Sequence, residues 1–122
     1  MQLDAKSVSV DVSGDYYQVC FDTEDREDDQ ICPFEQPAPY LLVQRQFEWF
    51  DGDLCYIESH DVEYIGHFQL TLIELSPTRF TFEIARRDHK RVEVSFALTA
   101  AEFEKAQPGI EVIFGLREPS DN

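Results

Sequence analysis

The sequence predicts one α+β domain, with a mainly antiparallel sheet of about six to seven strands and a C-terminal helix packed on one face. Along most of the 122 residues, apolar and polar residues alternate with the two-residue period of a β-strand. A helical period appears only at about 99–114. The length suits one domain rather than two, and 43% hydrophobic residues are enough for a core. We therefore treat 1–122 as a single domain.

Alternation is clearest near the N-terminus, where Val8, Val10 and Val12 share one side and small polar residues share the other. Strands are predicted at 7–13, 16–21, 40–50, 54–59, 67–75, 79–86 and 91–98. The connections at 76–78 and 87–90 are short, and short connections join antiparallel neighbours. The last three strands should therefore form a meander.

The helix is predicted from its ends as well as its period. Thr99 and Glu102 have the spacing of a capping box, and Gly115 suits the position after the last turn. Pro108 either kinks this helix or begins a second short one. The apolar stripe consists of Phe103, Ala106, Ile110, Ile113 and Phe114. A closed β-barrel with an appended helix is the alternative architecture.

The charge is the strongest functional signal. Twenty-five acidic residues against ten basic ones give a formal charge of −15. Such a field repels nucleic acids and anionic membranes and attracts a basic protein partner. Acidic residues gather in the predicted loop at 22–39 and around the hairpin at 51–63, beside an aromatic residue suited to a binding hot spot. The predicted partner-binding residues are Asp22, Glu24, Asp25, Glu27, Asp28, Asp29, Trp49, Asp51, Asp53, Glu58, Asp61 and Glu63.

Motifs for chemistry are weak. The chain has no P-loop, dinucleotide fingerprint or nucleophile elbow. A calcium loop counted from Asp22 fails because Pro33 stands where the bidentate glutamate is needed. Cys55, His60 and His67 come nearest to a zinc site or a thiol–imidazole pair, but their spacing fits neither. We therefore expect no cofactor, no metal and no enzymatic activity.

The three cysteines, Cys20, Cys32 and Cys55, do not form a disulfide framework by number or spacing. The first residues lack an apolar signal core, and no stretch approaches the roughly 20 apolar residues of a membrane span. We expect a cytoplasmic protein with reduced thiols.

Several segments resemble the immunity protein 10 family of bacterial polymorphic toxin systems. They are YLLVQRQFEWF at 40–50, CYIESH at 55–60, GHF at 66–68, LIELSPTRFTF at 72–82, VEVSF at 92–96 and the helix reaching Ile113-Phe114. The similarity covers roughly residues 40–115 and excludes the N-terminal strands and the acidic loop. It implies an α+β cytoplasmic protein that binds a cognate toxin and blocks it. It assigns no binding residue by position.

Two other hypotheses stay open. The chain is alternatively an acidic interaction module or a DNA mimic within a larger complex, or, third, a small metal-binding or thiol enzyme that uses Cys55, His60 or His67. An exposed edge strand would also allow pairing with a second copy, which leaves a homodimer open.

Overall fold

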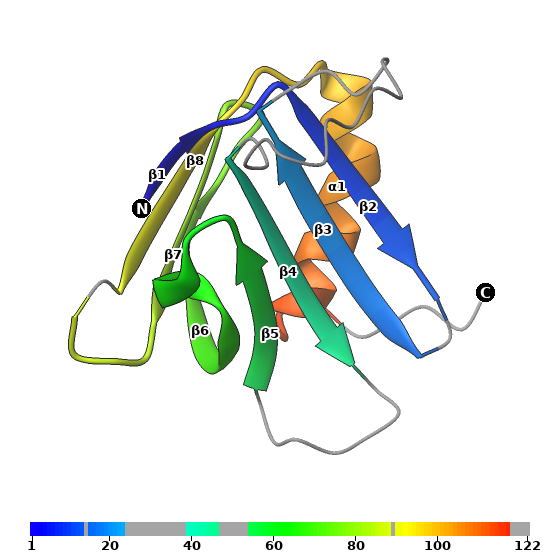
Figure 1. Ribbon diagram of the computed structural model, residues 1–122. Coiled ribbons are helices and arrows are strands. Elements are labelled where there is room, and N and C mark those ends of the chain that lie inside the picture. The colour runs from blue at the N-terminus through cyan, green and yellow to red at the C-terminus, as the bar shows by residue number, and fades with distance from the viewer. Residues whose placement is uncertain (14, 24–38, 47–53, 89, 118–122) are drawn as a thin grey trace, which may run out of the picture.

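The computed structural model describes residues 1–13, 15–23, 39–46, 54–88 and 90–117, and it forms one mixed sheet with a C-terminal helix (Figure 1). The strands are β1 (Gln2–Asp4), β2 (Ser7–Val12), β3 (Tyr16–Asp22), β4 (Tyr40–Gln46), β5 (Leu54–Ser59), β6 (Gly66–Leu75), β7 (Arg79–Ile84) and β8 (Arg91–Ser95). A short 3-10 helix, η1 (Val62–Tyr64), precedes β6, and α1 (Ala100–Ile113) follows β8. The α+β class is confirmed.

The eight strands lie in the order β1-β8-β7-β6-β5-β4-β3-β2, and every pair except the parallel β1–β8 pair is antiparallel. The expected meander over β6, β7 and β8 is present. One strand more is found than the seven segments predicted. The additional strand is β1, whose three residues are too few to display an alternating pattern.

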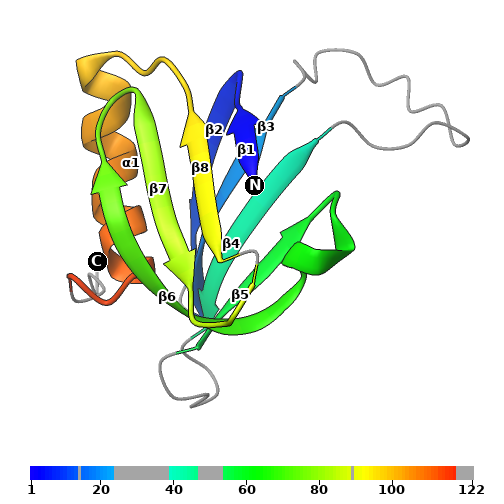
Figure 2. The same cartoon turned by 90° about the vertical axis from the view of Figure 1, so that its left-hand side faces the viewer.

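The sheet turns a corner at β6. Residues 66–69 of this strand pair with β5, residues 70–75 pair with β7, and the register shifts between Leu72 and Glu74. A bulge of this kind bends a strand, so that its two halves can pair with different neighbouring strands. As a result the sheet curls, with β6, β7 and β8 on one side and β3 and β4 on the other (Figure 2).

The two edge strands of the sheet, β1 and β2, are consecutive in the chain and are joined by Ala5 and Lys6. The Ala5 N–H donates to the Ser95 carbonyl of β8, and the Lys6 N–H donates to the Asp22 carbonyl of β3. The sheet order is nevertheless open, because β1 and β2 are its two ends. The architecture is therefore a curled sheet carrying a helix rather than a fully paired barrel.

Alternation along the strands fills the interior. Buried side chains include Val19, Phe21, Leu41, Val43, Ile57, Phe80, Phe82, Val92 and Val94, all with no exposed surface. Phe21 of β3 stacks on Phe80 of β7 with ring centroids 5.2 Å apart, which joins the two sides of the curl. We call this buried side of the sheet the inner face.

The helix covers the inner face and has the predicted ends. The Thr99 hydroxyl accepts from the Glu102 N–H at 3.2 Å, and the Glu102 carboxylate accepts from the Thr99 N–H at 2.9 Å, so the capping box is confirmed. Gly115 adopts a positive φ of 74° just past the last turn. The helix is continuous through Pro108, so the alternative of a second short helix is wrong.

Side chains from the sheet hold the C-terminal end of α1. The Ile113 carbonyl accepts from the Cys55 thiol at 3.3 Å and from the Arg45 guanidinium at 3.5 Å. No basic residue lies in the last turn of α1 itself, so Arg45 supplies the cation that this end of a helix dipole favours. In Figure 1 the helix lies behind β2 and β3, the strands on which it packs.

Residues 61–66, between the strands predicted at 54–59 and 67–75, contain η1 and then the first residue of β6. Asp22, expected to begin the acidic loop, is the last residue of β3 and pairs with Tyr40. The predicted strand at 40–50 is described only as far as Gln46. Among the described residues, no helix has the length and apolar character needed to cross a membrane.

Candidate binding surface on the outer face of the sheet

The face of β3, β4, β5 and the start of β6 that points away from the core is polar and aromatic. We call it the outer face and define it by Gln18, Cys20, Asp22, Tyr40, Leu42, Gln44, Tyr56, Glu58, His60 and His67. These residues alternate with the buried ones, so the sequence period places them together on one side. Eight of them are half-buried and two are exposed.

The register sets which outer-face residues are neighbours. Leu42 of β4 lies opposite Glu58 of β5, and Gln44 lies opposite Tyr56. Tyr40 is therefore diagonal to Glu58 across the strands, within the reach of a tyrosine side chain. Tyr56 is two residues from Glu58 along β5 and so shares its face. Both phenol rings thus lie within reach of one carboxylate.

Glu58 accepts hydrogen bonds from both tyrosines. The Tyr40 hydroxyl donates to Oε2 at 3.2 Å and the Tyr56 hydroxyl donates to Oε1 at 3.0 Å. Burial, followed by the Glu58 carboxylate, raises the pKa of both phenols above the ordinary value of 10.0. The two hydroxyl protons are therefore held firmly against Glu58 at neutral pH. We call Tyr40, Glu58 and Tyr56 the tyrosine–glutamate cluster.

Two histidines border this cluster. The His67 ring lies against the Tyr56 ring with centroids 5.2 Å apart. The His60 Nδ1 atom lies 3.2 Å from both the backbone nitrogen and the carbonyl oxygen of Tyr40, and the two rings are 6.4 Å apart. Aromatic rings therefore extend along one side of the outer face, over β4, β5 and the start of β6.

The outer face has no basic side chain over its three central strands. Arg45 is the only Lys or Arg in β3, β4 and β5, and it reaches across the inner face to the end of α1. Five of the ten basic residues lie instead at 79–91, in β7, β8 and their turn. Among the residues that define the outer face, the carboxylates are those of Asp22 and Glu58, and no Lys or Arg balances them.

The predicted partner-binding residues divide into three groups. Glu58 lies in the tyrosine–glutamate cluster, and Asp22 lies on the outer face at the end of β3. The Asp61 carboxylate accepts from the Glu63 N–H at 3.1 Å and so caps η1, while the Glu63 backbone carbonyl accepts from the Arg86 side chain. The remaining predictions, Glu24, Asp25, Glu27, Asp28, Asp29, Trp49, Asp51 and Asp53, lie outside the described residues.

The structure separates the thiol from the histidines. Cys55 is 3% exposed on the inner face, where it donates to the Ile113 carbonyl. His60 and His67 lie on the outer face, so the sheet stands between them and Cys55. Within the described part of the chain, no three His, Cys, Asp or Glu side chains are grouped as a metal site would require.

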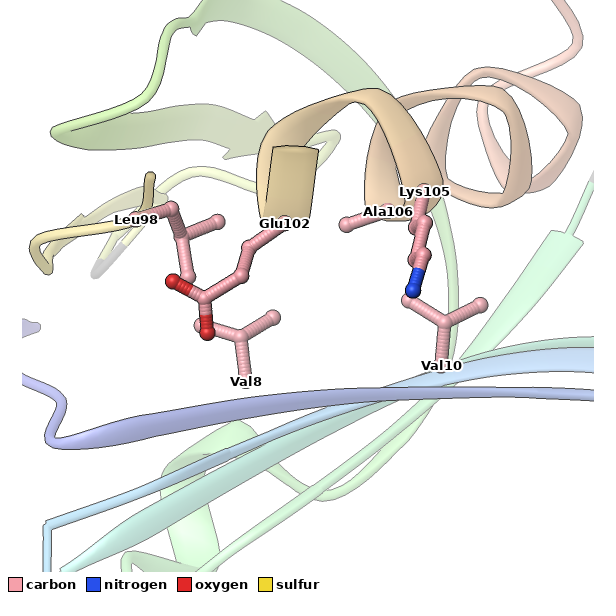
Figure 3. A pocket seen from close by; sticks show the side chains of 6 residues that line it. All are labelled: Val8, Val10, Leu98, Glu102, Lys105 and Ala106. Atoms are coloured by element: carbon pink, nitrogen blue, oxygen red, sulfur yellow. The ribbon is translucent and has the colours of Figure 1, made fainter. Parts of the chain in front are cut away.

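A small hollow lies between β2 and the first half of α1 (Figure 3). Its volume is about 220 Å³, below the roughly 300 Å³ at which small-molecule sites begin. Val8, Val10, Leu98 and Ala106 line it, and the Glu102 and Lys105 side chains extend from the helix toward the strand. Its small volume indicates a gap in the packing between α1 and β2 rather than a ligand site.

Sequence reasoning included Glu58 among the partner-binding residues but did not single out Tyr40. The available signal was the alternation of 40–44 and 56–60, which puts tyrosines, Gln44 and Glu58 on the polar side of two strands. The strand register was needed to bring Tyr40 to Glu58.

No protein-family model matches the chain, and no curated protein matches it. The resemblance to the immunity protein 10 family therefore stays a prediction.

Proposed function

We propose that the protein is a non-enzymatic acidic binding protein that neutralises a cognate bacterial toxin in the cytoplasm by occluding it. The observation that carries this proposal is the outer face, where two tyrosines and a carboxylate are held together and β3, β4 and β5 place no Lys or Arg side chain beside them. The surface suits contact with a basic protein.

Tyrosine is the residue expected at the centre of such a contact. A tyrosine side chain supplies a large apolar ring and a polar tip at low entropy cost, and it is enriched among the residues that dominate binding energy. Tyr40 and Tyr56 are already ordered by Glu58, so little freedom is left to lose on binding.

The charge of the whole chain supports the same partner. The segments 24–38 and 47–53, which connect β3 to β4 and β4 to β5, contain nine acidic residues and one basic residue. A toxin that attacks nucleic acid must be basic to hold phosphate. Opposite charge raises the association rate above the neutral range of about 10⁵–10⁶ M⁻¹s⁻¹, which favours capture of a lethal target. The toxin itself is inferred from the family resemblance of residues 40–115.

The test uses the toxin domain encoded beside the gene. We expect co-expression of this protein to restore growth, and the two purified proteins to elute as one complex. The association rate should fall about tenfold or more from low to high salt, because charge steering is screened. A neighbouring toxin domain that neither binds nor loses its toxicity would rule out the proposal. Binding to several unrelated nucleic-acid-handling proteins would favour the DNA-mimic alternative.

A further inference from the structure

The tyrosine–glutamate cluster presents hydrogen-bond acceptors to solvent. Each phenol has one O–H donor, and both are directed at Glu58. The oxygen lone pairs that remain, on the carboxylate and on the two hydroxyls, only accept. A ligand for this cluster must therefore donate several hydrogen bonds.

Such a ligand must also carry positive charge and tolerate aromatic neighbours. Glu58 is a carboxylate on a surface without Lys or Arg over β3, β4 and β5. The rings of Tyr40 and Tyr56 flank it, and cations bind favourably over tyrosine faces. A bound divalent metal would require more carboxylates than this cluster offers.

We propose that Tyr40, Glu58 and Tyr56 form a binding site for the guanidinium of an arginine side chain presented by the partner protein. This inference rests on the proposed function for the partner, while the site itself is defined by the cluster. Arginine fits better than lysine because its planar fork has five donors, pairs with a carboxylate and stacks on aromatic rings.

The cluster can be tested without the partner. The probes are three capped tripeptides, acetyl-Gly-X-Gly-amide, with X as arginine, lysine or citrulline. Citrulline keeps the shape of arginine without the charge. Binding is followed by NMR shifts of the Tyr40, Glu58 and Tyr56 amides as each peptide is added to the full chain.

We expect the arginine peptide to bind most tightly and to shift these three amides. Glu58→Gln should weaken it about fivefold, the upper range for an exposed charged pair, because the tyrosine rings remain. Tyr56→Phe keeps the ring and should weaken binding less. Glu74→Gln, an equal charge change at an exposed position of β6, is the matched control and should leave binding unchanged.

Equal binding of the arginine and citrulline peptides would overturn the inference, as would unchanged arginine binding by a folded Glu58→Gln variant. The peptide assay and the toxin assay fail separately. If the arginine peptide binds through Glu58 but the neighbouring toxin domain does not bind, the site stands and the proposed function fails. If the toxin binds equally well to Glu58→Gln and to wild type, the function stands and this site is wrong.

Discussion

Cys55, Ile57 and Ser59 occupy one face of β5 and are at most 3% exposed, whereas Tyr56, Glu58 and His60 alternate with them on the other face and remain in part or largely exposed. Cys55 and Ile57 pack in the core, and Cys55 also bonds the end of α1. The outer residues bond one another and the neighbouring β4. One six-residue strand thus separates the groups that stabilise the fold from those available to a partner.

This difference shows which substitutions inform on function. A strand needs an apolar inner face to fold, but its outer face needs only to be compatible with a sheet. A Tyr-Glu-Tyr arrangement with the hydroxyls directed at one carboxylate is more specific than that requirement. The outer face is therefore where we look for recognition, and the inner face is where we expect effects on stability.

The largest expected effect separates the two faces directly. Ile57→Ala on the inner face should lower the free energy of unfolding by about 2–5 kcal/mol, because it removes buried methylenes and leaves a cavity. Leu42→Ala on the outer face should cost about 1 kcal/mol or less, because Leu42 is already half-exposed. Urea unfolding followed by circular dichroism measures both.

Equal losses from the two variants would contradict the comparison, since they would mean that the outer face is covered in the folded protein. The Ile57→Ala chain that remains folded should still bind the arginine peptide, because Ile57 faces away from Glu58.

A smaller effect concerns the contact between the inner face and the helix. A Cβ atom at Gly109 would lie 2.6 Å from the Val10 Cγ1 atom, closer than the packing permits. Gly109→Ala should therefore cost up to about 2 kcal/mol, since strain of about 1–3 kcal/mol opposes a gain of about 1 kcal/mol in helix propensity. In a Val10→Ala background the same change should be neutral or stabilising.

A double-mutant cycle in urea isolates this coupling. Additive losses would show that Gly109 is not held against Val10, and that α1 is less closely seated on β2 than the structure shows. Arginine-peptide binding should be unchanged throughout, because both residues lie away from the outer face.

Much of this fold follows from local sequence signals. Val19, Phe21, Val92 and Val94 reveal their strands by alternation, and Thr99 with Glu102 reveals the start of the helix. β1 could not be found in this way, because its pairing with β8 joins residues about 90 apart in the chain. The meeting of the two sheet ends at Ala5 and Lys6 depends on that same long-range pairing.

The candidate site was less accessible to sequence reasoning. Charge singled out Glu58 together with Asp61 and Glu63, although the Asp61 carboxylate caps η1. Charge alone does not distinguish a recognition group from a helix cap. The distinction required the β4–β5 register, which brings Tyr40 diagonally to Glu58. The placement of Cys55 opposite the histidines follows from alternation along β5 and past its end to His60, once His67 is known to pair with Tyr56.

Glu58→Gln has the smallest expected effect on stability, and it tests the hydrogen bonds of the outer face most directly. Glu58→Gln should change the free energy of unfolding at neutral pH by about 1 kcal/mol or less, because the hydrogen bonds it alters are partly exposed. The pKa values of Tyr40 and Tyr56 should nevertheless fall. Burial raises them first and Glu58 raises them further, so removing the charge removes only the second contribution.

Phenolate absorbance, recorded between about pH 9 and 12, measures this shift. A phenol whose folded pKa is raised contributes stability that is complete below its unfolded value of 10.0 and is lost as pH rises through the folded value. Wild type should therefore lose more stability above pH 10 than Glu58→Gln does, while Glu74→Gln should follow wild type. If the phenols of Glu58→Gln titrate as in wild type, the tyrosines are not held by Glu58, and the acceptor surface proposed for arginine is absent.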